Sequence, residues 1–138
     1  MIVTDKHAFY ASFLAGAPAD WIIAPGVELC ARCEHHEWGI ALQVEHTLLP
    51  AWQLKRALEL RFSDQVKYSE YFLFVDLTRN LVIWHPTTGP RLNAEEVDTV
   101  RYRLLALVSM TALYWQDYQN DTDGHSARIR QLTSIHKR

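Results

Sequence analysis

The chain has 138 residues, of which 49% are hydrophobic and 22% charged, and its formal net charge is −2 with histidine neutral. This length predicts one globular domain with a sizeable core, and the mild negative charge argues against direct binding of nucleic acid. No apolar run approaches the roughly 20 residues that span a bilayer, and the N-terminus lacks the pattern of a signal peptide. We therefore expect a cytoplasmic protein with two reduced cysteines and no membrane contact.

The N-terminal residues predict a helix followed by a strand. Thr4 or Asp5 can cap the first N–H groups of this helix, and Gly16 is its expected end. The side chains expected to be buried are Phe9, Tyr10 and Phe13. A short apolar run over 21–23, closed by a Pro-Gly pair, indicates a strand and a turn.

Two segments then alternate between apolar and polar side chains. Residues 27–34 and 38–45 show the period of two that is typical of half-buried strands, and a short polar link joins them. They predict a β-hairpin. Pro50 opens a second helix at its first turn, where the missing N–H costs nothing. The apolar line of this helix consists of Leu54, Leu58 and Phe62.

The aromatic and branched residues 71–75 predict a strand that is buried on both faces, near the centre of a sheet. After a turn, residues 81–84 are expected to pair back onto it. The order is therefore helix, three strands, helix, two strands, helix. That order predicts a single α+β domain over 1–120, with one antiparallel sheet and helices on one face.

The longest predicted element is one continuous helix from Asn93 to Tyr118. Apolar side chains recur in it at intervals of three and four residues, and Asn93 can cap its first N–H groups. Its second half is apolar on nearly all sides, so a second face must be covered by the chain's own core or by a partner protein. We favour the partner. The expected partner-binding side chains are Leu105, Met110, Leu113 and Trp115.

One cluster has the composition of a metal site. Cys30, Cys33, His35 and His36 could together supply four ligands to zinc. On a strand, however, residues 30 and 33 point to opposite faces, and no second ligand pair lies at a zinc-finger distance. We therefore expect no metal and no cofactor, with Cys33 in the apolar register and Cys30 pointing outward. Because no nucleophile motif or phosphate-binding loop is present, we expect no catalytic residues and no enzymatic activity.

The residues after Asn120 are polar. We interpret 121–138 as a basic, solvated C-terminal tail that folding does not require. Its cations are Arg128, Arg130, Lys137 and Arg138. The three-residue spacing of Ile129, Leu132 and Ile135 leaves open that these side chains dock onto the body of the protein.

In size and in the order of its elements, the chain resembles the small class I type III secretion chaperones. It is more similar still to the HrpV-type regulators of plant-pathogen type III secretion. This likeness covers about Lys6 to His85 and rests on HAFYASFLAGAPADWIIAPGVEL, GIALQVEHTLL, LPAWQLKRALELRF and YFLFVDLTRNLVIW. The resemblance implies a non-enzymatic virulence regulator that restrains the transcriptional activator of the secretion genes. It also implies that a chaperone-like partner of the HrpG type relieves this restraint.

The sequence leaves three hypotheses. The first is a regulator that binds a protein partner, in a homodimer or a heterodimer, and contacts no nucleic acid directly. The second is a class I-like secretion chaperone, either of the HrpG type or one that binds an effector. The third is a small metal or thiol enzyme built on Cys30, Cys33, His35 and His36.

Overall fold

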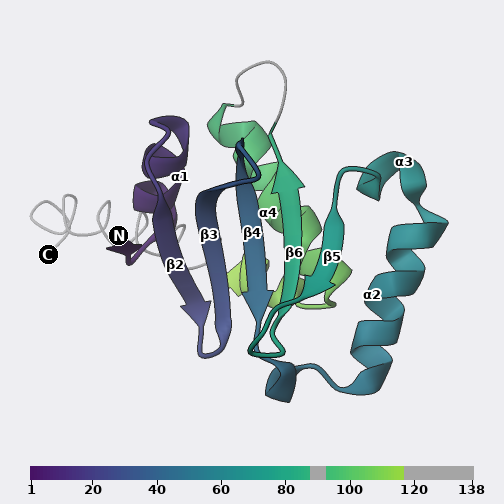
Figure 1. The fold of residues 1–138 in the computed structure, drawn as a ribbon. Coiled ribbons are helices and arrows are strands. Elements are labelled where there is room, and N and C mark those ends of the chain that lie inside the picture. Colours follow the sequence, from purple (N-terminus) through teal and green to yellow (C-terminus); the bar gives the residue numbers. More distant parts are fainter. Residues whose placement is uncertain (88–92, 117–138) are drawn as a thin grey trace, which may run out of the picture.

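The computed structural model describes residues 1–87 and 93–116. Within them, one six-stranded sheet has the order β1-β2-β3-β4-β6-β5 (Figure 1). The strands are β1 (Ile2–Val3), β2 (Ala19–Ala24), β3 (Val27–Glu34), β4 (Glu37–Val44), β5 (Phe72–Val75) and β6 (Leu81–Pro86). The helices are α1 (Lys6–Leu14), the 3-10 helix η1 (His46–Leu48), α2 (Ala51–Ser63), α3 (Gln65–Tyr68) and α4 (Ala94–Leu107). A further helical segment covers 111–116.

The predicted α+β class and the single sheet are confirmed. The predicted order was incomplete, because it lacked β1 and the short α3. Strand β1 has two residues, too few to show an alternating pattern, and it pairs with β2 in parallel, whereas the other neighbouring strands are antiparallel. The predicted domain end at 120 and the tail 121–138 lie outside the described residues. None of the described helices is long and apolar enough to cross a membrane.

Helix α1 begins and ends where the sequence predicts. The side chain of Asp5 accepts a 2.8 Å hydrogen bond from the N–H of Ala8, which satisfies one of the free N–H groups of the first turn. Gly16 takes the left-handed conformation, with φ of 72°, that closes a helix end. The predicted buried side chains, Phe9, Tyr10 and Phe13, all lie in the core.

The predicted hairpin is formed by β3 and β4. The two strands pair residue by residue from Val27 with Val44 to Glu34 with Glu37. His35 and His36 connect them with φ values of 50° and 68°, the positive values at both central residues that a two-residue hairpin turn of type I′ requires. The polar link predicted between the strands is therefore a tight turn.

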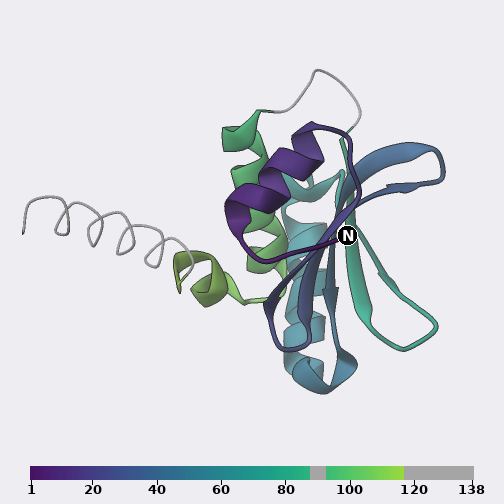
Figure 2. The same cartoon turned by 90° about the vertical axis from the view of Figure 1, so that its left-hand side faces the viewer.

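The core lies between the sheet and two helices. Both α1 and α4 lie behind the sheet in Figure 1, and Figure 2 shows them on the same side of it. Leu29, Leu42 and Ile83 of the sheet and Leu104 of α4 are fully buried there. Helix α2 lies beyond β5 and contacts α4 (Figure 1). We call the opposite side of the sheet, toward the viewer in Figure 1, the open face, because no described helix covers it.

Strand β5 is not central, as predicted, but the outermost strand of the sheet. Strand β6 lies between β4 and β5, so one edge of β5 has no neighbouring strand among the described residues. Phe72, Phe74 and Val75 are consequently exposed. The apolar composition of 71–75 indicates which side chains favour a sheet, but it does not determine their place in the strand order.

The predicted continuous helix over 93–118 is interrupted. Asn93 caps α4 as predicted, since its side chain accepts a first-turn N–H at 2.8 Å. The helix ends at Leu107, and Ser109 follows in the left-handed conformation with φ of 59°. The N–H of Met110 then donates a 2.9 Å hydrogen bond to the carbonyl of Leu105, which closes the helix end. Serine rarely occupies this position, where glycine is usual, so the sequence carried no signal for the break.

Candidate functional site

A buried polar network joins α1, α4 and the segment 111–116. Arg101 of α4 is 1% exposed; it donates a 2.8 Å hydrogen bond to the Tyr10 hydroxyl and pairs with Asp98 at 3.2 Å. Asp98 also accepts 2.5 Å hydrogen bonds from the hydroxyls of Tyr10 and Tyr114. The Arg101 guanidinium lies 4.4 Å from the centroid of the Tyr114 ring. Tyr114 therefore fastens the segment after the break to α4.

The network also sets the ionisation of its carboxylate. Partial burial raises the pKa of Asp98, but the hydrogen bonds from Tyr10 and Tyr114 and the charge of Arg101 outweigh this effect. The pKa of Asp98 therefore lies below its ordinary value. Asp98 is ionised at neutral pH and balances the charge of the buried Arg101.

The four predicted partner-binding side chains differ in accessibility. Leu105 has an exposed fraction of 0% and lies in the protein's own core. The prediction that Leu105 points outward is wrong, because α4 packs against the sheet and also contacts α1 and α2. Met110 and Leu113 are partly buried and pack against the same core. Trp115 is 50% exposed, with its ring against those of Tyr102 and Tyr114.

The cysteines and histidines that suggested zinc do not come together. Cys30 and Cys33 lie three residues apart on β3, so they point to opposite faces, as predicted. Which thiol is buried was predicted wrongly: Cys30 is buried and Cys33 is exposed. Cys30 lies on the open face in a small cluster with Ala41, Val82 and Trp84, whereas Cys33 lies near the end of the hairpin. His35 and His36 occupy the turn itself.

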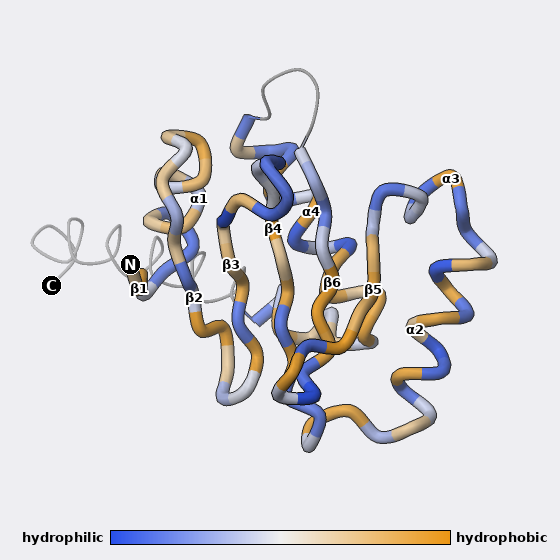
Figure 3. The backbone as a smooth tube through the Cα atoms, in the orientation of Figure 1, coloured by the Kyte–Doolittle hydropathy of each residue, from blue (hydrophilic) through white to orange (hydrophobic). Residues whose placement is uncertain are grey.

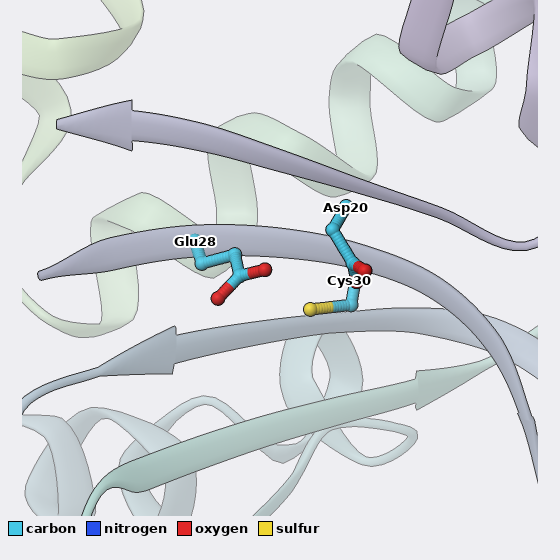
Figure 4. A group of neighbouring side chains, drawn as sticks. All are labelled: Asp20, Glu28 and Cys30. Atoms are coloured by element: carbon cyan, nitrogen blue, oxygen red, sulfur yellow. The ribbon is translucent and has the colours of Figure 1, made fainter. Parts of the chain in front are cut away.

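The structure instead groups Asp20 with Glu28 and Cys30 on the open face (Figure 4). One ligand atom from each of the three lies within 4.8 Å of the others, and two carboxylates are ligands that a hard cation accepts. Burial and the charge of Glu28 raise the pKa of the Cys30 thiol to about 12, so a metal would have to displace its proton. Spacing in the sequence could not reveal this cluster, because it depends on the pairing of Asp20 in β2 with Cys30 in β3.

Two rows of side chains cross the open face from β2 to β5. One consists of Ile22, Glu28, Gln43, Val82 and Phe74, and the other of Asp20, Cys30, Ala41, Trp84 and Phe72. Both rows carry acidic groups toward β2 and β3 and apolar groups toward β6 and β5. The indole of Trp84 lies so close over β4 that a Cβ on Gly39 would come within 2.6 Å of it. A side chain at position 39 would therefore clash with the Trp84 indole and with the backbone carbonyl of His85.

Helix α2 exposes part of its predicted apolar line. Leu54 packs against the core, but Leu58 and Phe62 are exposed, and Phe62 is 67% accessible. Figure 3 shows hydrophobic positions repeated along α2 and concentrated on β5 and β6. Large exposed apolar side chains occur on both elements at this end of the molecule: Trp52, Leu58 and Phe62 on α2, and Phe72 and Phe74 on β5. We call these five side chains together the α2–β5 surface.

Comparison with known proteins gives one match. A family model described as HrpV-like matches residues 2–112, which include every strand of the sheet, the open face and the α2–β5 surface. No curated protein and no solved structure shows a significant match. The matched range is well over half of the chain. The chain belongs to the HrpV-like family.

Proposed function

We propose that this protein is a non-enzymatic regulator of bacterial type III secretion that acts by binding other proteins. The HrpV-like match over 2–112 carries this proposal, since that family is associated with the regulation of type III secretion. We further propose that the protein acts in the cytoplasm of a plant pathogen. There it restrains the transcriptional activator of the secretion genes until a chaperone-like partner of the HrpG type binds it.

The α2–β5 surface supports binding through protein contact. Soluble proteins rarely leave several large aromatic side chains exposed together unless another molecule covers them, and Phe and Trp are enriched at the centres of interfaces. Phe62 and Trp52 are both more than 60% exposed. Because β5 is an edge strand among the described residues, its outer backbone groups can also accept a strand from a partner.

A single surface used by two partners would account for the relief of restraint. In this proposal the activator and the chaperone-like partner both bind the α2–β5 surface, so that one excludes the other. A second candidate contact is formed by Trp115 with Met110 and Leu113, which lie on the segment held by Tyr114. Association of two copies, or of this chain with a relative, would use the same exposed side chains.

Co-purification from a secreting host tests the proposal. We expect the activator or the chaperone-like partner to be retained by the wild-type protein and lost with Phe62→Asp or Phe74→Asp. Leu14→Asp is the matched control, because Leu14 is exposed to a similar extent as Phe74 but lies at the end of α1. Circular dichroism should show all three variants folded. Retention of the partner by both surface variants would contradict this assignment of the surface.

The second candidate function is a class I-like secretion chaperone. The outermost position of β5 in the described sheet favours it as well, because an extended effector segment can add to an edge strand. The two functions differ in what co-purifies. Recovery of the N-terminal region of an effector, without activator or regulator, would support the chaperone and contradict the regulator.

A further inference from the structure

The chain leaves the described part of the structure beside β2, near the edge of the sheet. Gln116, the last described residue, lines a groove together with Leu113 and with Trp21, Ile22 and Ile23 of β2. Ile22 is 56% exposed. The same side chain also forms part of the wall of a second hollow, on the open face. The two hollows are therefore neighbours, separated at β2 by Ile22.

The second hollow has a volume of about 200 Å³ and is lined mainly by polar groups. Glu28 and Glu45 contribute carboxylates to its wall, and Gln43 and Asn80 contribute side-chain amides. Four side chains with carbonyl or carboxylate oxygens in one concavity can accept several N–H donors at once. A planar guanidinium offers five such donors. The hollow is thus suited to an arginine side chain.

The charges around the hollow also favour a cation. Burial and the nearby charge of Asp20 raise the pKa of Glu28, which means that the local environment disfavours its ionised form. Arg32 opposes this effect, but its guanidinium is 2.9 Å from Glu34 at the other end of the strand. An additional positive charge at the hollow would stabilise the Glu28 carboxylate.

The sequence beyond Gln116 contains a segment with the complementary character. Residues 125–138 include four basic and no acidic side chains, and three large apolar ones: Arg128, Arg130, Lys137, Arg138, Ile129, Leu132 and Ile135. Arg128 is twelve residues from Gln116, and an extended chain covers up to about 40 Å over that length at about 3.3 Å per residue. A six-stranded sheet is only about 24 Å wide at about 4.8 Å per strand, so the segment can reach the hollow.

We propose that residues 125–138 of the same chain dock on the acidic half of the open face. In this arrangement the guanidinium of Arg128 or Arg130 enters the hollow between Glu28 and Glu45, and apolar side chains of the segment cover Ile22. The apolar half of the face and the α2–β5 surface stay accessible to a partner.

Paramagnetic NMR on the full chain tests the proposal. A nitroxide is attached to Ser134→Cys in a Cys33→Ser background, where the remaining thiol, Cys30, is buried. We expect the amide signals near Ile22, Glu28 and Gln43 to lose most of their intensity, while those of α2 keep theirs. Replacing both Asp20→Asn and Glu28→Gln should restore the intensities severalfold. The control Glu59→Gln, on exposed α2, should leave the pattern unchanged.

Two outcomes would overturn the inference. The first is that the amide signals of the open face show no selective loss of intensity. The second is that the loss appears only in a mixed sample, in which ¹⁵N-labelled chains lack the nitroxide and unlabelled chains carry it. The second result would identify the occupant as the segment of another copy. Should the Asp20 and Glu28 variant fail to fold, the variant Arg128→Gln with Arg130→Gln removes the charges from the other side of the contact. This arginine variant should restore the amide intensities severalfold, as expected for the Asp20 and Glu28 variant, and a failure to do so would contradict the proposal.

Discussion

The side-chain amide of Gln53 in α2 donates a 2.5 Å hydrogen bond to the backbone carbonyl of Val108, the residue that caps the C-terminal end of α4. The last carbonyls of a helix have no partner within the helix, so this bond satisfies one of them inside the protein. It also fixes α2 against α4 through a buried polar contact. This contact, together with the packing of Leu54 and Leu60 against the core, holds α2 in place.

Replacing Gln53 with alanine should destabilise the protein by about 1–3 kcal/mol, because a buried carbonyl loses its donor. Urea unfolding followed by circular dichroism measures this change. Gln65→Ala is the control: this glutamine is exposed on α3 and its loss should change the free energy of unfolding by no more than about 0.5 kcal/mol. Equal effects of the two substitutions would mean that the bond to Val108 contributes nothing.

Asp98→Asn should cost roughly 3 kcal/mol at neutral pH, because it removes the carboxylate that balances the buried Arg101. The substitution keeps the size of the side chain and retains a carbonyl for the tyrosine hydroxyls. Chemical denaturation at pH 7 gives the value. Glu59→Gln serves as the control, because Glu59 forms an exposed ion pair with Lys55. Surface pairs of this kind contribute at most about 1 kcal/mol, so this substitution should cost much less than Asp98→Asn.

The Asp98 carboxylate should also make the free energy of unfolding depend on pH in the acidic range. The folded-state pKa of Asp98 lies below the ordinary value of 3.8, so its contribution is fully present above that value and is lost as the pH falls through the folded-state pKa. Unfolding free energies measured from pH 6 to pH 2 should fall more steeply for the wild type than for Asp98→Asn. Parallel curves would show that Asp98 has the same pKa in the folded and unfolded states.

Features that depend on neighbouring residues were predictable from the sequence. Asp5 and Asn93 cap their helices because a side chain two or three residues from a free N–H can reach it, and the hairpin turn at His35 and His36 follows from two alternating strands. The edge position of β5 depends instead on which distant strands pair. The break at Ser109 depends on tertiary packing that outweighs helix propensity.

In the candidate site, too, features set by nearby residues were predictable and features set by distant residues were not. The sequence indicated opposite faces for Cys30 and Cys33, which follows from the period of two along a strand. It could not indicate which face is more tightly packed, because Trp84 and Val82, which cluster with Cys30, come from a strand more than 50 residues away. Likewise, the apolar line of α2 was visible in the sequence, but its exposure follows from the place of α2 beside the sheet.

Because Cys30 is buried and Cys33 is exposed, the contrary of what the sequence predicted, substitution of Cys30 should be the more destabilising. Cys30→Ser should destabilise the protein by about 1 kcal/mol, since it places a hydroxyl among apolar neighbours, whereas Cys33→Ser should stay within about 0.5 kcal/mol. Thermal unfolding of both variants provides the comparison. We expect both to retain partner binding. A larger loss of stability for Cys33→Ser would contradict the packing described for β3.

The final prediction separates the core of α4 from the segment that follows it. Leu105→Asp places a carboxylate at a position with an exposed fraction of 0%, and the cost of several kcal/mol is a large part of a typical stability of about 5–15 kcal/mol. This variant should be unfolded by circular dichroism and elute early in size-exclusion chromatography.

Trp115→Asp should behave differently, because half of the Trp115 side chain is exposed. The variant loses ring contacts with Tyr102 and Tyr114, each worth about 1 kcal/mol, and should remain folded because Tyr114 still binds Asp98. If the segment 111–116 contacts the partner, this folded variant should retain much less of it than Leu14→Asp does. Normal retention would exclude Trp115 from the interface and leave the α2–β5 surface as the place where the partner binds.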